Sequence, residues 1–600
     1  MYYYNSWSTA HKKPFGAIRV GQMMEVLFDS DKPHVEVKFI IRRDFGKRYE
    51  FSMERTAIGK FRVLVPFDVG RGLYFYYFEI SEPSDWGKIR HYYGSTGIGG
   101  EGILYGNEHD VKPYQLTVYD GEDVSPKWYR EAIFYQIFPD RFHNGNEDGH
   151  INHPKPNSFI YGTKADTPFY VKEENGDLAR WDFFGGNLQG IIKKIPYLKE
   201  LGVTALYLNP IFSAISNHRY DTSDYLEIDS MLGTLDDFKE LLKKVHESDM
   251  HVILDGVFSH VGKNSRYFNI NGDYGDKEGA AKNPDSPYFQ WFKFENYPLE
   301  YKSWWGIKDL PEIDKENTSF QNFIYGQEDS VLAKWNKLGI DGWRLDVADE
   351  LPDHFIRGIR ENLAHSPEKV LIGEIWEDAS NKISYGARRN YILGEGLQGC
   401  MNYPFRDLII NFLIGKRSSQ ETAQRFMSLY ENYPHSIFYG NLNNLGTHDT
   451  ERILTMVGSH NNLLAIAMLF SLPGVPCIYY GDEVALTGGK DPDNRKYFPW
   501  EKPRDEVFQT YQVWSKKRVK EQVLIQGDFS MFFTSTLLGI LRYTEQEVYV
   551  QLINSNEENF RLNFKEITFL QPLDFLSLLE QSLEDIEIPG KSQINLILSR

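Results

Sequence analysis

Residues 191–210 read IIKKIPYLKELGVTALYLNP, in which an amphipathic segment leads directly into a short apolar run. The pattern repeats at once, because the amphipathic FKELLKKVHESD (238–249) precedes the apolar HVILDGVF (251–258). Apolar residues at helical spacing predict helices, and short apolar runs predict buried strands. Strands joined through helices lie parallel, so this stretch predicts two units of a parallel α/β sheet.

The same alternation extends over the middle of the chain and gives eight short apolar runs in all. Eight strands separated by helices predict a closed (β/α)8 TIM barrel, which we place at residues 123–520. Residues 258–318 are rich in Asn, Asp, Gly and aromatic side chains and interrupt the alternation, so we expect a loop domain after the third strand. The eight runs are AIFYQIFP (132–139), VTALYLNP (203–210), HVILDGVF (251–258), DGWRLDVA (341–348), KVLIGEIW (369–376), GCMNYP (399–404), NLGTHD (444–449) and VPCIYYGDE (475–483).

Both flanks of the barrel have the alternation that is typical of strands. Val35, Val37 and Phe39 are separated by charged residues, and GLYFYYFEI (72–80) is a dense aromatic run. Residues 1–122 therefore predict an N-terminal β-sandwich. The pattern returns at the other end in GILRYTEQEVYVQLINS (539–555), so residues 521–600 predict a C-terminal β-sandwich.

Composition excludes several classes of protein. Lys and Arg total 66 against 84 for Asp and Glu, and a net charge of −18 argues against a nucleic-acid partner. The apolar stretch from Leu463 to Tyr480 contains two prolines and a glycine, so it predicts a buried helix and strand, with no membrane partner. With only Cys400 and Cys477, and no apolar leader at the start, we expect a cytoplasmic protein without disulfides.

Polar residues that follow four of the apolar runs are the candidates for catalysis, because active sites of TIM barrels lie at the carboxyl ends of the strands. In WRLD, Arg344 and Asp346 share one face of a strand, where the guanidinium would keep the carboxylate ionised. Glu374 has apolar neighbours and suits a proton donor. The candidates are Asp255, His260, Arg344, Asp346, Glu374, His448 and Asp449.

One ionised and one protonated carboxyl group are what a glycosidase requires. Sequence does not give their separation, so this reasoning alone leaves retaining and inverting mechanisms open. A metallohydrolase built from Asp255, His260, His448 and Asp449 is an alternative, although no HExxH or similar ligand pair is present.

Four stretches in this order, DGVFSH (255–260), GWRLDVADE (342–350), GEIWED (373–378) and GTHD (446–449), resemble the conserved segments of the α-amylase family, glycoside hydrolase family 13. The segments GVTALYLNPIF (202–212) and GVPCIYYGDEVALTGGKDPDNRKYFPW (474–500) agree with this. The first 122 residues resemble the carbohydrate-binding-module-like sandwich of neopullulanases, maltogenic amylases and cyclomaltodextrinases, and YQIFPDRFHNGN (135–146) supports this subgroup.

The resemblance implies a role for each matching residue. Asp346 would be the nucleophile of a retaining reaction, Glu374 the general acid/base, and Asp449 the third carboxylate, which holds substrate hydroxyls. Arg344 would orient Asp346, His260 and His448 would bind sugar hydroxyls, Tyr220 would stack on the sugar and Asp255 would support the site.

The segment YKSWWGIKDLPEID (301–314), together with GEIWEDAS (373–380), resembles amylopullulanases more than typical neopullulanases. Trp304, Trp305 and Trp376 would then line subsites and admit α-1,6 as well as α-1,4 bonds. Packing of the loop domain explains the same tryptophans equally well.

The resemblance implies no required cofactor, and it leaves calcium as an open question. Ser259 stands where many members of the family have a calcium-binding Asn. A second calcium site of the subgroup would use oxygen atoms of Asn144, Asn146, Asp148, Gly185 and Asn187, a set with few carboxylates.

The sequence thus predicts a retaining glycoside hydrolase that cleaves α-1,4 and, by extension, α-1,6 glucosidic bonds in maltodextrins, cyclodextrins, pullulan or starch. The alternatives are an α-glucan transglycosylase, in which a sugar hydroxyl replaces water, and a non-catalytic carbohydrate-binding homologue. For the N-terminal domain two uses stay open: binding of starch through Trp or Tyr side chains, or a homodimer in which this domain walls the partner's active site, as the resemblance to maltogenic amylases suggests.

Overall fold

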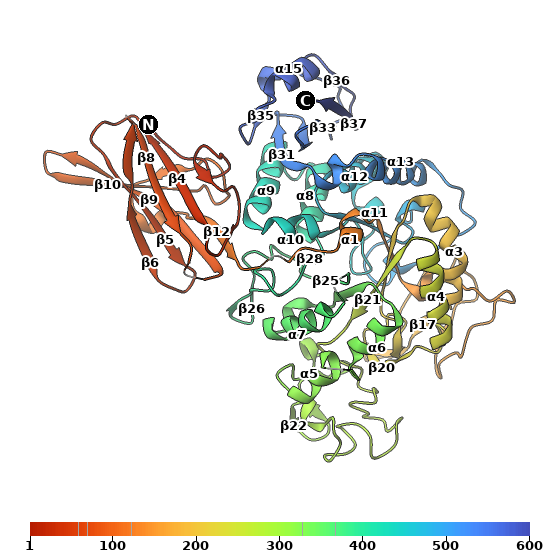
Figure 1. Ribbon diagram of the computed structural model, residues 1–600. Helices are drawn as coiled ribbons and strands as arrows, with labels where there is room; N and C mark the ends of the chain where they lie inside the picture. Colours follow the sequence, from red (N-terminus) through yellow and green to blue (C-terminus); the bar gives the residue numbers. More distant parts are fainter. Residues whose placement is uncertain (58, 69, 122, 327, 367) are drawn as a thin grey trace.

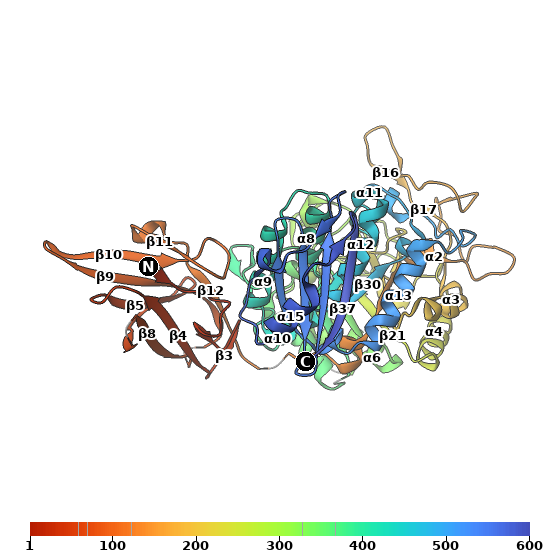
Figure 2. The same ribbon diagram turned by 90° about the horizontal axis from the view of Figure 1, so that it is seen from above.

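The computed structural model describes residues 1–57, 59–68, 70–121, 123–326, 328–366 and 368–600. An eight-stranded sheet in the middle of the chain is preceded and followed by regions rich in antiparallel strands. Figures 1 and 2 show the N-terminal region standing to one side of the barrel, whereas the C-terminal sheet packs on helices α9 and α12. Residue 122, where we place the end of the first domain, lies outside the described residues.

The central sheet is a closed parallel barrel, as the sequence predicts. Strand pairs run parallel from β28 through β13 to β29. A parallel bridge between Met401 and Leu442 joins the two end strands and closes the ring. The barrel strands are β13 (Phe134–Ile137), β18 (Ala205–Leu208), β21 (His251–Gly256), β24 (Gly342–Leu345), β25 (Val370–Gly373), β28 (Gly399–Cys400), β29 (Leu442–Asn444) and β30 (Val475–Tyr479).

Helices cover the outside of this ring (Figure 1). The repeat quoted from residue 191 becomes α3, which Asn187 caps at its start and which Gly202 ends with a left-handed φ of 89°. The helices after the barrel strands include α3 (Leu188–Leu201), α4 (Leu235–Glu247), α5 (Thr318–Tyr325), α6 (Val331–Leu338), α7 (Asp353–Ala364), α8 (Tyr403–Leu413), α9 (Ser419–Asn432), α10 (His435–Gly440), α11 (Ile453–Val457), α12 (Ser459–Ser471) and α13 (Glu506–Lys520).

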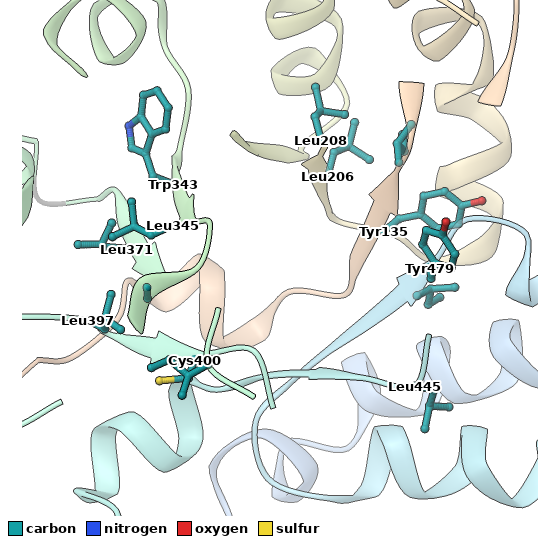
Figure 3. Packing of buried hydrophobic residues seen from close by; sticks show 14 of the residues in the cluster. Tyr135, Leu206, Leu208, Trp343, Leu345, Leu371, Leu397, Cys400, Leu445 and Tyr479 are labelled. Carbon is teal, nitrogen blue, oxygen red and sulfur yellow. The ribbon is translucent and has the colours of Figure 1, made fainter. Parts of the chain in front are cut away.

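Barrel strands are mostly apolar because both of their faces are buried. Phe134, Ala205 and Ile253 pack inside the barrel, whereas the residues that alternate with them pack outward on the helices. Figure 3 shows Leu206 and Trp343 among the residues of that outer layer. Period two thus places Arg344 on the inner face, opposite to Trp343, as predicted.

The apolar stretch from Leu463 to Tyr480 is the expected buried helix and strand, since it covers most of α12 and all of β30. Within the described part of the chain, no helix is both long and apolar enough to cross a membrane.

The N-terminal region consists of two sheets that enclose their own core. Tyr74, Tyr76 and Phe78 are buried in it, as expected for one face of a strand. One sheet contains β1 (Tyr2–Tyr3), β2 (Lys12–Lys13), β4 (Met23–Ser30), β7 (Glu54–Ala57) and β8 (Lys60–Pro66); the other contains β3 (Ile18–Arg19), β5 (Glu36–Arg43), β6 (Arg48–Ser52), β9 (Gly72–Ser84), β10 (Gly87–Gly94), β11 (Ile103–Tyr105) and β12 (Tyr114–Tyr119).

The C-terminal region is a five-stranded antiparallel sheet with layers on both faces. Phe529 and Ile540 pack on the barrel helices, whereas Leu541 and Val550 pack under a short helix and a two-stranded sheet. The elements are β31 (Asp528–Phe533), β32 (Leu538–Tyr543), β33 (Glu547–Asn554), β35 (Thr568–Phe569) and β37 (Ser592–Ser599), with α15 (Leu576–Leu583), β34 (Phe560–Arg561) and β36 (Glu587–Ile588).

Two long segments extend the carboxyl end of the barrel. The segment between β21 and α5 contains the pair β22 (Phe294–Asn296) and β23 (Glu300–Tyr301), where the sequence predicts a loop domain. The sequence does not reveal the other, between β13 and α3, which contains β14 (Phe159–Ile160), β15 (Val171–Lys172), β16 (Leu178–Arg180) and β17 (Asp182–Phe183). Its strands have two or three residues, too few to show a period.

Asp341, at the amino end of the barrel, provides a test of stability away from the cavity. It accepts hydrogen bonds from the backbone N–H of Val252 (2.8 Å), His246 (3.0 Å) and His251 (3.1 Å). Burial raises the pKa of Asp341, but these bonds outweigh burial and lower the pKa to about 2. A lowered pKa stabilises the fold above the unfolded value, and this contribution is lost as the pH falls towards 2.

We therefore expect Asp341→Asn to reduce the free energy of unfolding at pH 7 by about 2 kcal/mol. Urea unfolding at pH 7 and at pH 3 measures the difference in free energy of unfolding between the wild type and the variant. This difference should be smaller at pH 3, because protonation of Asp341 removes part of the stabilisation that its ionised carboxylate provides. Equal stability of the two proteins at pH 7 would show that the histidines do not hold this carboxylate.

Candidate active site

Four charged side chains meet at the carboxyl ends of β21, β24 and β25. Asp255 pairs in register with Arg344, and Asp346 follows two residues later on the same face. Arg344 Nη1 lies 2.7 Å from Asp255 Oδ1 and 2.9 Å from Asp346 Oδ1, and its Nη2 lies 2.8 Å from Glu374 Oε2. One buried guanidinium thus fixes three carboxylates, which strand register and period bring together.

A cavity of about 900 Å³ opens directly above this group. Asp255 and Arg344 are fully buried and lie beneath the cavity wall. The other predicted residues line it, together with residues that the sequence reasoning did not single out. The predicted lining residues are Tyr220, His260, Asp346, Glu374, Trp376, His448 and Asp449, with Trp304 and Trp305 from the loop domain.

Glu374 is held from three sides. Its Oε2 accepts a hydrogen bond from the backbone N–H of Val347 at 2.8 Å and faces Arg344, whereas its Oε1 accepts one from Trp376 Nε1 at 3.1 Å. Trp376 in turn stacks on Tyr403 with ring centroids 3.9 Å apart. Oε2 therefore receives the stronger positive field, and Oε1 is the oxygen better suited to carry a proton.

Val347 adopts φ 37° and ψ 61°, a left-handed conformation that is strained for a β-branched residue. The strained residue directly follows Asp346, and its backbone N–H is the group that donates to Glu374 Oε2. Such outliers persist where the surrounding structure enforces them, commonly at functional sites.

Burial changes the expectation for Asp346. Its pKa is raised, first by burial and then by the charges of Glu374 and Asp255, whereas Arg344 beside it lowers the pKa. The prediction that Arg344 keeps this carboxylate ionised omitted burial, which a sequence does not show. Arg344 is shared among three carboxylates, so it does not neutralise each of them fully.

Asp449 and His448 form the opposite part of the site. Burial, followed by the charge on Glu374, raises the pKa of Asp449 to about 7. About a third of the Asp449 side chain is open to the cavity, so water moderates this effect. Burial lowers the pKa of His448 well below its usual value and keeps the ring neutral.

Tyr220 connects the carboxylates to His448. Its hydroxyl donates to Asp255 Oδ2 at 2.8 Å and lies 2.7 Å from His448 Nε2, and the two rings stack. His260, expected to bind a sugar hydroxyl, has both ring nitrogens engaged, by the backbone oxygen of Tyr220 and by Ser259 Oγ. In this geometry His260 contributes the side of its ring to the cavity.

Sequence reasoning missed part of the cavity wall. Asp491 and Arg495 form an ion pair at 2.8 Å; both lie in the DPDNR segment, which we quoted without assigning its residues. Tyr170 comes from the unpredicted segment before α3 and donates to Asp491 at 2.5 Å. Lining residues from loops have no regular spacing. The remaining ones are His218, Ile307, Leu310, Val347, Asp349, Glu350, Glu377, Lys382, Ile383, Ser384 and Tyr385.

This barrel and its carboxylates match a known family. The model of the alpha-amylase catalytic domain matches residues 136–523. The chain therefore belongs to the alpha-amylase family of glycoside hydrolases.

Relatives and solved structures agree with this assignment. The chain is 34% identical over 593 residues to an amylopullulanase from Thermoanaerobacterium saccharolyticum, with 87% of this chain and 45% of that protein covered. It is 31% identical to neopullulanase 2 from Thermoactinomyces vulgaris, with 80% of each covered. The structure of a cyclic α-maltosyl-(1→6)-maltose hydrolase from Arthrobacter globiformis aligns with TM-score 0.67 and 30% identity, over 79% of this chain and all of the other. The chain spans less than half the length of the amylopullulanases that it matches.

Proposed function

We propose that this protein is a retaining hydrolase of α-glucans, with Asp346 as nucleophile and Glu374 as general acid/base. The observation that carries the proposal is that both carboxyl groups line one cavity and contact the same buried guanidinium, that of Arg344. Attack by Asp346 would displace the sugar leaving group, which takes a proton from Glu374; water, deprotonated by Glu374, would then release the sugar.

The other residues would bind and orient the sugar. Asp449 lines the cavity with about a third of its side chain open and can hold hydroxyl groups, and Tyr220 can present a ring face to the sugar. His448 has Nδ1 engaged by Gln136 at 2.9 Å and Nε2 by the Tyr220 hydroxyl at 2.7 Å, so it would bind a sugar hydroxyl only by exchanging one of these partners. Arg344 and Asp255 support the reacting carboxylates from below. A cavity of about 900 Å³ lined by tryptophans accommodates more than one sugar unit, which supports maltodextrins, cyclodextrins, pullulan or starch as substrates.

Incubation with pullulan, β-cyclodextrin and soluble starch, with products separated by ion chromatography, tests the proposal. Panose or maltose from pullulan with rapid opening of cyclodextrin would indicate cleavage of α-1,4 bonds, and maltotriose from pullulan would indicate α-1,6 cleavage. Longer oligosaccharides from concentrated maltotriose at the outset would favour the transglycosylase, and no product at all would favour the non-catalytic homologue.

The residues expected to bind calcium do not fit a cation well. Asn144 Oδ1 accepts a hydrogen bond from Asn187 Nδ2 at 3.0 Å, and Asn187 Oδ1 accepts two backbone N–H groups. Asn146 Nδ2 donates to the backbone oxygen of His150. The one carboxylate of the set, Asp148, is exposed and bonded to His150. Ser259 Oγ is engaged by His260. We propose that hydrogen bonds hold this loop without calcium.

Accordingly, we expect the Tm to be the same, within about 1 °C, in EDTA and in millimolar calcium, measured by scanning calorimetry. A bound ion at 100 times its Kd would add about 2.7 kcal/mol of stability, so a clear rise in Tm with calcium would contradict the proposal. Asn187→Asp is the control for sensitivity, because it places a carboxylate oxygen against Asn144 Oδ1 and should make the Tm depend on calcium.

We further propose the domain division 1–122, 123–520 with 258–318 inserted, and 521–600, because these limits separate the sandwich, barrel and C-terminal sheet.

Trp86 at the tip of the β9–β10 hairpin is 98% exposed and could contact a glucan or a second subunit. A homodimer through residues 1–122 remains our proposal, which the mass of the truncated protein in solution would test. Two buried, unpaired cysteines suit a cytoplasmic location.

A further inference from the structure

A small hairpin after β25 forms one wall of the cavity. It consists of β26 (Ile383–Ser384) and β27 (Ala387–Arg388), joined by Tyr385 and Gly386, which both have positive φ. A left-handed tyrosine is uncommon, so the surrounding contacts must hold it in place. Tyr385 is 75% exposed and lines the cavity with Lys382.

The hairpin lines the same cavity as Glu374. It belongs to the same connection as Glu374, which would give its proton to the leaving group, and as Trp376, which donates to Glu374 Oε1. The Tyr385 hydroxyl donates to Glu350 Oε1, which also accepts a hydrogen bond from Trp305 Nε1 at 3.1 Å. Two exposed aromatic rings are thus held together by one carboxylate, that of Glu350, which lines the same cavity as Glu374.

The N-terminal region holds the base of this hairpin. Arg388 Nε donates to Asp44 Oδ2 at 2.7 Å, and both side chains are largely buried. Gln115 Nε2 donates to Ser380 Oγ at 2.8 Å, and Asn381 Nδ2 donates to Gln115 Oε1 at 2.9 Å. Figure 1 shows β26 on the side of the barrel that faces β12. Ser380 and Asn381 precede β26 and Arg388 lies in β27, so the N-terminal region contacts the hairpin on both of its sides.

The hairpin also has an anchor on the barrel itself. Arg389 Nη2 donates to Asp353 Oδ1 at 2.9 Å, and Arg389 Nη1 donates to the backbone oxygen of Asp349 at 2.7 Å. Loss of the contacts with the N-terminal region should therefore loosen the hairpin without detaching it from the barrel.

We propose that Asp44 and Gln115 are positioning residues through which the N-terminal region of the same chain sets the leaving-group side of the active site. They hold the hairpin so that Tyr385 and Lys382 bind glucose units beyond the cleaved bond. The inference rests on the proposed function. It identifies the preferred substrate as an α-glucan chain that extends past the reacting carboxylates to the hairpin.

The test compares Asp44→Ala/Gln115→Ala with the wild type on two substrates. 4-Nitrophenyl α-maltoside has no glucose unit beyond the cleaved bond, whereas soluble starch does. We expect the KM for starch to rise about threefold to tenfold, in line with the loss of a few hydrogen bonds, with kcat unchanged. Both constants for the nitrophenyl maltoside should stay unchanged. Glu36→Ala, which removes an exposed ion pair with Lys88 within the N-terminal region, is the matched control.

Two further measurements separate positioning from general stability. Hydrogen exchange of residues 380–394 should accelerate in the double variant while exchange of the barrel strands stays the same. In a Lys382→Ala/Tyr385→Ala background, which itself should raise the KM for starch, the Asp44→Ala/Gln115→Ala substitutions should have no further effect.

An unchanged KM for starch, or equal losses on both substrates, would overturn the positioning role. If the wild type cleaves neither substrate, the proposed function fails, and hydrogen exchange still decides whether the N-terminal region holds the hairpin. Unchanged exchange of residues 380–394 would overturn that contact too.

Discussion

Asp346→Asn is expected to lower kcat for maltodextrins on the order of 10⁴-fold or more, because an amide cannot form the covalent intermediate on which a retaining reaction depends. Asp346 lines the cavity, and Arg344 Nη1 holds its Oδ1 at 2.9 Å. The amide has nearly the same size, so the fold and the binding of substrate should persist. Steady-state kinetics with maltoheptaose, together with the Tm, measures both.

Asp341→Asn is the matched control, because it makes the same chemical change at the opposite end of the same strand. It should reduce stability and leave kcat near the wild-type value at 25 °C. Asp346→Gly adds a positive test: azide, placed where the carboxylate was, should attack an activated α-maltoside and give the β-glycosyl azide. Substantial turnover by pure Asp346→Asn, or no azide product, would argue against Asp346 as nucleophile.

Regular spacing determines which parts of the site the sequence could predict. Arg344 and Asp346 are two residues apart on a strand, so period two places them on one face, and the parallel register then brings Asp255 beside Arg344. Glu374 follows the next strand. These predictions needed only the assignment of strands, which the short apolar runs alternating with amphipathic segments made clear.

The rest of the cavity comes from segments without periodicity. Tyr170 reaches the site from a segment with strands of two or three residues, and Tyr385 from a two-residue turn. Their positions depend on contacts with residues far away in the sequence, such as Asp491 and Glu350. Burial of Asp346 is equally a property of the assembled barrel, which explains why its raised pKa was not foreseen.

Glu374→Gln is expected to reduce kcat for maltodextrins about 10³-fold, since general acid catalysis contributes roughly 10²- to 10⁴-fold. The effect should depend on the leaving group. α-Maltosyl fluoride needs no proton to depart, so the first step should proceed, whereas the second lacks the base that activates water.

The glycosylated protein should therefore accumulate with the fluoride, and mass spectrometry after digestion should find the sugar on the peptide that contains Asp346. Glu368→Gln is the matched control, because Glu368 precedes the amino end of β25 whereas Glu374 follows its carboxyl end. This variant should keep wild-type kinetics with both substrates. An equal loss of kcat with maltodextrin and with α-maltosyl fluoride would show that Glu374 does not act as a general acid. Because Trp376 and the N–H of Val347 hold the two oxygens of Glu374 separately, Trp376→Phe should cause a weaker loss of kcat for maltodextrins, since it removes only the hydrogen bond to Oε1.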